Sequence, residues 1–433
     1  MERFRASLFL VPMIGLLAAL ALGVTTITVD SRLDWDAAEL PLGFSSTVES
    51  ARSLLSTIAG ATITFAGIAF SISLLTIQGA TNQYSPRVVH TLFRDPFNKR
   101  VMALVVGTFT YCLVVLRSVR SPLESNGDPV IPHASVALAV VLGIATILAT
   151  VAFIDHSAHS MDVSEILGRV AREATTRIHS EWTPPTAARV TPYVVNTAPG
   201  YTLRYEQSGW IQRVDTAAML RLIPDGGTLQ LDAQPGRYAI AGTRLGLLTP
   251  SPADPRAIER AIGTEIVVGD TRTMQQDVSY GLRQLVDVTL RALSPGINDP
   301  TTAQDAIFHT AAVLLELLRH DPPTTERIGD RGQRVVLTNS PTTAELIGLA
   351  FDETRRAAAS HPTVCIYLLE ALALIREPLD EAGLNNRTDG LVDQARLIVT
   401  GCRASALVPA DISLVEEAFA VRFGGAAGAP DHG

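Results

Sequence analysis

Two histidines near residue 156 are the first group in this sequence that could do chemistry. His156 and His159 stand three positions apart, so they would share one face of a helix. With Asp155 or Asp162 they could bind a divalent metal, because imidazole nitrogens and carboxylate oxygens are common metal ligands. They could equally be polar side chains at the end of an apolar segment. We favour this second interpretation, since the flanking residues match no known metal-binding helix.

A second group surrounds a tight corner that reads SPGINDP, residues 294–300. Asn298 and Asp299 offer oxygen atoms to a ligand. Arg283 and Asp287 lie four positions apart on the helix predicted just before the corner. These four residues are the candidates for ligand binding. Capping explains the corner without a ligand, because Asp299 suits the N-cap of the next helix and a proline suits its first position.

A third group follows one face of an apolar segment predicted to be a helix. Small and hydroxyl-bearing residues recur there at spacings of three and four: Ser53, Thr57, Gly60, Thr64, Gly67 and Ser71. In lipid, such a stripe lets helices pack closely. The same hydroxyls and the exposed backbone could instead line a hydrated path in an oligomer. Both interpretations stay open. No charged residue lies in the segment, which argues against an ion-coupled pump.

The sequence carries no recognisable signal for catalysis or for a cofactor. GxSxG, HExxH, Walker A and dinucleotide-binding fingerprints do not occur. The three cysteines, Cys112, Cys365 and Cys402, are too widely spaced for a zinc motif or a disulfide framework, and we expect buried thiols. A net charge of −8 without a Lys/Arg cluster argues against nucleic acid as a partner. We therefore expect neither an enzyme nor a bound cofactor.

The elements that position these groups begin with an α-helical polytopic membrane domain. Of the 433 residues, 47% are hydrophobic and 18% are charged, whereas soluble domains carry about 25% charged residues. A bilayer requires roughly 20 apolar residues per helix. Four segments qualify or come close, at about 8–29, 53–77, 101–116 and 134–153. The first runs past any signal-peptide cleavage site, so we expect it to be retained.

The charges of the connections predict the orientation. Basic residues precede the first segment and fill the amphipathic connection at 78–100, where Ser85 and Pro86 are expected to begin a helix. The first connection is acidic. The positive-inside rule therefore predicts cytoplasmic N- and C-termini in a bacterial inner membrane. Arg117 and Arg120 in the third connection run against this orientation.

The rest of the chain has the pattern of a cytoplasmic α+β region. Short segments separated by glycine-rich turns predict a small β-barrel or sandwich. Helical periodicity follows, with one more strand expected at Arg334–Leu337. The expected order is a four-helix transmembrane domain (1–155), a helical stalk and linker (156–186), a small β domain (187–250), a mainly helical domain (251–423) and a disordered tail (424–433).

Three stretches of this sequence resemble a known family. They are QYSPR at 83–87 with FTYCLVVLR at 109–117, SGWI at 208–211, and DVSYGLRQLVDVTLRALSPGINDPTTA at 277–303. The chain resembles the uncharacterised bacterial predicted membrane proteins of domain of unknown function family 2254. The resemblance covers nearly the whole chain and implies a membrane location and this domain order. It implies no activity, because the family has no established function or catalytic residue.

Two functions fit these patterns. The first is an oligomeric channel or transport-related protein for an ion or small molecule, with the stripe near a pore and a cytoplasmic regulatory domain. The second is a membrane-anchored sensor or scaffold whose cytoplasmic domain binds a ligand or protein partner. The lipid bilayer is a partner in both cases, and we expect further copies of the chain in a homo-oligomer.

Overall fold

The computed structural model describes residues 10–32, 47–83, 96–121, 131–159, 162–184, 199–338 and 340–424. The chain divides into two units, Met1–Glu165 and Ile166–Gly433, called here the N-terminal unit and the C-terminal unit.

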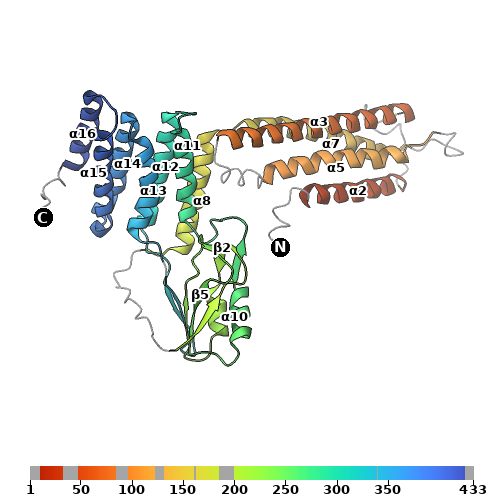
Figure 1. Cartoon of the computed structure of the whole chain (residues 1–433). Coiled ribbons are helices and arrows are strands. Elements are labelled where there is room, and N and C mark those ends of the chain that lie inside the picture. The colour runs from red at the N-terminus through yellow and green to blue at the C-terminus, as the bar shows by residue number, and fades with distance from the viewer. Residues whose placement is uncertain are drawn as a thin grey trace, which may run out of the picture. The chain divides into compact units, whose positions relative to one another are not determined.

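Four helices in the described part of the N-terminal unit are long and apolar enough to cross a membrane. They are α2 (Leu10–Asp30), α3 (Val48–Gln83), α5 (Pro96–Ser118) and α7 (His133–His159) (Figure 1). The four predicted segments are confirmed as helices, and the last three extend beyond their predicted bounds. The third segment was predicted from residue 101, but α5 begins at Pro96, a residue suited to the first helical position. The helix expected at Ser85 and Pro86 lies outside the described residues.

Small residues let α2 and α5 approach each other closely. A Cβ added at Gly15 of α2 would lie 2.8 Å from the carbonyl oxygen of Ala103 in α5. Gly23 faces Val114 at a similar distance, and Gly107 of α5 lies against the Gly15 backbone. Lipid tails are as apolar as leucine, so close backbone approach is one of the main ways to stabilise a helix pair in a bilayer. Within one chain, this small-residue packing lies between α2 and α5.

Hydrogen bonds between polar side chains add further links among these helices. The buried hydroxyls of Thr108 in α5 and Thr146 in α7 lie 2.9 Å apart. Asp30, at the end of α2, accepts hydrogen bonds from the amide (2.8 Å) and the hydroxyl (2.6 Å) of Ser135. It thereby caps the first turn of α7 from another helix. These bonds help to select which helices are neighbours, because an unsatisfied polar group in hydrocarbon is costly.

A helix follows the last apolar segment, as its periodicity predicts. It is α8 (Val163–Glu181), whose apolar side includes the buried Ile166, Val170 and Ala174. Ala174 lies against Gly281 of α11 (Ser279–Ala292), where an added Cβ would come within 2.8 Å of the alanine Cβ. α8 is therefore packed into the C-terminal unit.

Two β-sheets lie in the described part of the C-terminal unit. The larger has the strand order β1 (Tyr201–Arg204), β5 (Arg244–Thr249), β3 (Thr228–Leu231), β8 (Arg334–Leu337) and β7 (Glu326–Ile328). The smaller has the order β4 (Tyr238–Ala239), β2 (Gly209–Val214) and β6 (Ile266–Gly269). Strands β3 and β8 pair in parallel, and the other pairs are antiparallel.

The sheets extend beyond the boundary predicted at residue 250. Strands β6, β7 and β8 come from later in the chain, and α9 (Thr216–Leu222) and α10 (Pro255–Thr264) lie between strands. A shared apolar core, which includes Leu203, Leu229 and Val335, joins these distant segments. The strand at Arg334–Leu337 is confirmed, whereas β6 and β7 were not predicted. The result is a mixed helical and sheet region; the predicted barrel or sandwich is not confirmed.

Helices make up the rest of the described C-terminal unit. With α11 they are α12 (Pro300–Leu318), α13 (Thr343–Ala358), α14 (Pro362–Glu381), the short η1 (Asn385–Arg387), α15 (Asp389–Arg403) and α16 (Pro409–Phe423). The α-helices stand side by side in Figure 1. α12, α14 and α16 are successive neighbours, as are α11, α13 and α15. The tail predicted to be disordered lies outside the described residues from 425 onward.

Candidate functional site

The stripe on α3 faces away from the other helices of its own chain. All six residues, Ser53, Thr57, Gly60, Thr64, Gly67 and Ser71, are exposed. The hydroxyls of Thr57, Thr64 and Ser71 donate to the carbonyl oxygens of Ser53, Gly60 and Gly67, at 2.8–2.9 Å. A Cβ added at Gly60 or Gly67 would meet no atom within 4 Å. The stripe is therefore internally hydrogen-bonded and open to whatever surrounds the chain.

α3 packs within its own chain through a different face. The buried residues there are Ala51, Leu55, Ala59, Thr62 and Ala69. This face contacts α5 and α7. Packing inside one chain therefore does not explain the stripe. Packing between copies and lining of a hydrated path both remain compatible with its exposure.

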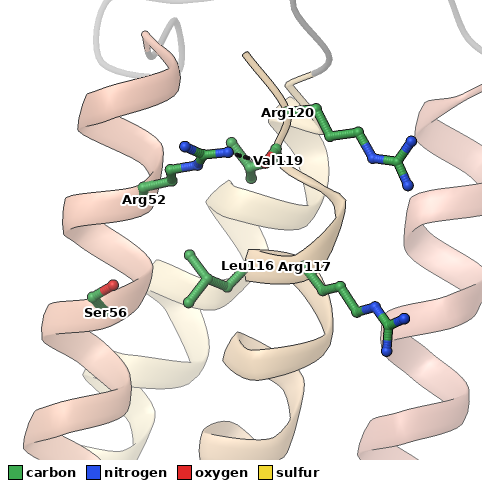
Figure 2. Close-up of a pocket in the computed structure, with 6 residues that line it drawn as sticks. All are labelled: Arg52, Ser56, Leu116, Arg117, Val119 and Arg120. Atoms are coloured by element: carbon green, nitrogen blue, oxygen red, sulfur yellow. Dashed lines mark hydrogen bonds between the residues drawn. The ribbon is translucent and has the colours of Figure 1, made fainter. Parts of the chain in front are cut away.

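Three arginines lie around an open pocket of about 580 Å³ at one end of these helices (Figure 2). Arg52 of α3 donates to the Val119 carbonyl oxygen at 2.9 Å, just past the end of α5. Arg117 and Arg120 are exposed and extend together, away from Arg52 (Figure 2). A guanidinium group can bind a phosphate or carboxylate through two parallel hydrogen bonds. Arg52 has a capping role, so Arg117 and Arg120 are the pair available to an anion.

The sequence did not predict this arginine pocket. Arg52 and Arg117 are 65 positions apart in the sequence. On their own they indicate only charges near the ends of predicted membrane segments. Their proximity depends on how α3 and α5 pack, which the sequence alone does not define.

The corner before α12 is a helix cap. Asp299 accepts from the Thr302 amide at 3.0 Å and from the Thr302 hydroxyl at 2.6 Å. These donors hold the pKa of the Asp299 carboxyl below its usual value. Asn298 is exposed and adopts the left-handed conformation, with φ of 48°. Asparagine tolerates this region better than most residues. The geometry agrees with the capping interpretation of Asp299, and Asn298 supplies the left-handed turn before the cap.

Arg283 and Asp287 form an ion pair within α11 that continues to α13. The guanidinium lies 2.8 Å from the Asp287 carboxylate and donates to both carboxylate oxygens of Glu353, at 2.6 and 3.1 Å. The hydrogen bond to Glu353 is the largest contribution that raises the pKa of Arg283. The Arg283 side chain of this pair reaches α13, whereas the Asp299 carboxylate contacts Thr302 in its own helix. The structure thus uses Arg283 and Asp287 to join two helices.

The first metal candidate is only partly described. The ring of His156 lies against the ring of Phe97, with centroids 4.7 Å apart. The side chain of His159 lies outside the described residues, so metal binding by this pair stays a prediction.

Similarity to known proteins agrees with the membrane character of the N-terminal unit. A family model described as "Predicted membrane protein (DUF2254)" matches residues 5–374. The chain belongs to the DUF2254 family. The uncharacterised proteins Mb1321c of Mycobacterium bovis and Rv1290c of Mycobacterium tuberculosis are each 30% identical to it over 352 residues. The matches cover 78% of this chain and 66% of each relative, so the chain spans about two thirds of their length. No solved structure matches it.

Two of the stretches that carry the DUF2254 resemblance, at 208–211 and 277–303, meet in the C-terminal unit. Arg272 lies over the rings of Trp210 and Tyr280, 5.9 and 5.2 Å from their centroids. Its Nε donates to the buried carboxylate of Asp277 at 2.5 Å. A Cβ at Gly236 would overlap that carboxylate, so glycine is needed there. The cluster fastens the start of α11 to the sheet region.

Proposed function

We propose that this protein is an oligomeric integral membrane protein whose copies pack along the stripe of α3, with a channel or transport-related role. The observation that carries the proposal is the exposure of all six stripe residues in a single chain. A surface of glycines and hydroxyls gains little from lipid tails. A second helix can approach it closely over Gly60 and Gly67, where nothing in the same chain stands in the way.

The transport role rests on the chemistry of the same surface. In a ring of copies, the hydroxyls of Thr57, Thr64 and Ser71 and the carbonyl groups they bond would line a central path. Such oxygens replace part of the hydration shell of a passing ion or small polar molecule. The stripe has no charged group to bind a coupling proton, which favours passive movement.

In this proposal the protein lies in the bacterial inner membrane with both termini in the cytoplasm, and it has no catalytic role. Basic residues before the first segment and in the second connection, at 78–100, support the orientation, as does the acidic first connection. Arg117 and Arg120 would then lie at the outer end. A cysteine placed at Arg120 should react with a membrane-impermeant thiol reagent in intact spheroplasts. Labelling only after the membrane is opened would place residue 120 on the cytoplasmic side and contradict the proposed orientation.

The test starts with the mass of the detergent-purified particle. We expect at least three copies of the 46.2 kDa chain. Replacing Gly60 and Gly67 together with leucine should reduce that number, because the added side chains block close helix approach. Phe70→Leu is the matched control, since Phe70 is 64% exposed on the same helix beside the stripe. A wild-type monomer, or equal loss of assembly in the control, would contradict the role of the stripe.

Ion flux into liposomes tests transport separately from assembly. Thr64→Val removes the hydroxyl without adding a bulkier side chain to the packing surface, so it should lower the flux while the particle mass stays unchanged. Unchanged flux in a variant that assembles normally would show that α3 does not line the path.

The second candidate function is a membrane-anchored sensor or scaffold whose large C-terminal unit binds a ligand or protein partner. The open pocket beside Arg117 and Arg120 lies in the N-terminal unit. It supports a sensor in which the membrane helices bind an anion and the C-terminal unit binds a protein partner, because exposed guanidinium groups bind anions. An assembled particle without flux in liposomes would favour this candidate over the first.

A further inference from the structure

Three metal-binding side chains from two separate helices meet in the C-terminal unit. His179 lies near the end of α8, Glu316 lies in the last turn of α12, and His320 follows that helix. Their ligand atoms all lie within 4.8 Å of one another. His179 Nε2 is 3.2 Å from Glu316 Oε2, and the two imidazole rings have centroids 5.4 Å apart. Two imidazoles and a carboxylate are a ligand set that holds Zn²⁺ with a fourth position open to water.

The imidazole of His320 is already oriented for a metal. Its Nδ1 lies 2.7 Å from the backbone carbonyl oxygen of Glu316. A carbonyl oxygen only accepts, so Nδ1 carries the proton and Nε2 keeps its lone pair in the neutral ring. Histidines that bind metals are commonly fixed in this way, by a second hydrogen bond to a carbonyl or carboxylate.

The backbone that carries these residues is held in place without a metal. Arg387 donates to the carbonyl oxygens of Leu318 and His320, both at 2.8 Å. Thr183 and Asp321 exchange two backbone hydrogen bonds, of 3.1 and 2.8 Å, which fasten the end of α8 to the end of α12. A site on fixed elements requires only side-chain adjustment when the ion binds.

One neighbouring charge competes for the carboxylate. Arg319 Nη1 lies 3.6 Å from Glu316 Oε1, and both side chains are partly exposed. That oxygen is not the one that faces His179, so the remaining oxygen of Glu316 is directed into the cluster. A contact of this length between exposed groups stabilises weakly.

We propose that His179, Glu316 and His320 bind a divalent transition-metal ion, with Zn²⁺ as the probe of choice. In tetrahedral geometry with bonds of about 2.0 Å, ligand atoms lie about 3.3 Å apart. The His179–Glu316 pair, at 3.2 Å, already has this separation, and the other pairs lie within 4.8 Å, so they close in by about 1.5 Å at most. When the ion binds, it replaces the contact between His179 Nε2 and Glu316 Oε2: the neutral imidazole carries its hydrogen on Nδ1, so that Nε2 and Oε2 both face the metal. The ion then links the first helix after the last membrane segment to α12. The proposal does not depend on the transport role.

The test uses the full chain in detergent, purified without a histidine tag and stripped of metal by a chelator. Competition with a chromophoric chelator measures Zn²⁺ binding, and we expect one tight site per chain. His179→Ala, Glu316→Gln and His320→Ala should each weaken binding about tenfold or more. Zn²⁺ should also raise the unfolding temperature of the wild type and not of these variants, because a ligand that binds only the folded state stabilises it.

Two controls test whether the site is the one assigned. His309→Ala removes another histidine of α12, which lies 3.6 Å from Asp305 and has no place in the cluster. The double change His156→Ala with His159→Ala removes the pair near the last membrane segment. Both should bind Zn²⁺ like the wild type. Loss of binding in either control, or wild-type affinity in the His179 or His320 variant, would overturn the assignment.

Arg319→Gln tests the use of Glu316 without removing a ligand. This change removes the competing cation and leaves all three ligands in place. It should bind Zn²⁺ at least as tightly as the wild type. Weaker binding in a variant that unfolds at the wild-type temperature would contradict the proposed use of Glu316.

Discussion

The Asp299 carboxylate accepts two hydrogen bonds from Thr302 at the start of α12. Asp299→Ala removes both bonds, and loss of an N-cap costs about 1 kcal/mol of stability. We expect a lower unfolding temperature, followed by tryptophan fluorescence, since Trp182 and Trp210 lie in the same unit. Asp299→Asn keeps an accepting oxygen and should stay close to the wild type. An equal loss in both variants would point to a role for the charge beyond capping.

The same carboxylate predicts a dependence on pH. Its pKa is lowered in the folded chain by the donors of Thr302. A carboxyl group of this kind stabilises the fold fully above its unfolded pKa of about 3.9, and the effect is lost as the pH falls through the folded value. The stability difference between the wild type and Asp299→Ala should therefore be constant near neutral pH and shrink below about pH 4.

The ion pair of Arg272 with Asp277 predicts a larger effect. The Asp277 side chain is only 4% exposed, so removing its partner leaves a buried charge. Arg272→Met should cost about 3 kcal/mol or more, measured by denaturant unfolding. Arg213→Met is the control, because its pair with Asp215 is about one third exposed on both sides and should cost less than about 1 kcal/mol. Similar losses in both would contradict the burial argument.

At this scale the sequence predicted local chemistry better than distant contacts. The cap at Asp299 and the pair of Arg283 with Asp287 depend on spacings of three and four residues, which a helix determines. The partners Glu353 of Arg283, Trp210 of Arg272 and His179 of Glu316 come from segments far along the chain. Their positions follow from how helices and strands pack, and no residue pattern within one segment indicates it.

At the scale of elements, two glycines with different surroundings predict opposite results. Gly15 of α2 lies against the Ala103 backbone, so Gly15→Leu should separate α2 from α5 and lower the yield of folded protein. Gly60 of α3 has nothing within 4 Å, so Gly60→Leu should leave the single chain folded and change only its assembly. Yield and unfolding temperature in detergent check the first effect, and particle mass checks the second. A folded Gly15→Leu variant would show that α2 can shift.

The apolar segments were predictable because each one is long and uninterrupted, so a bilayer alone requires a helix there. The sequence did not indicate which small residues pack against another helix of the same chain. The stripe of α3 was the obvious packing surface, yet α2 and α5 supply the close contact in a single chain. The short strands β6 and β7 failed for another reason. Both lie in a part of the chain whose pattern is mainly helical, and their pairing comes from β2 and β8 rather than from their own residues.

At the scale of the whole molecule, the two units predict where assembly resides. Residues 162–424 contain the described part of the C-terminal unit, and Asp162 accepts from the Ser164 amide at the start of α8, at 3.0 Å. This fragment should be soluble and unfold cooperatively, because its apolar cores are its own. It should also be a monomer by light scattering. The competing surface is α16, where Val421 is 77% exposed. A fragment that assembles to the same number of copies as the full chain would show that the C-terminal unit carries the assembly surface. The proposal that copies pack along the stripe of α3 would then be contradicted.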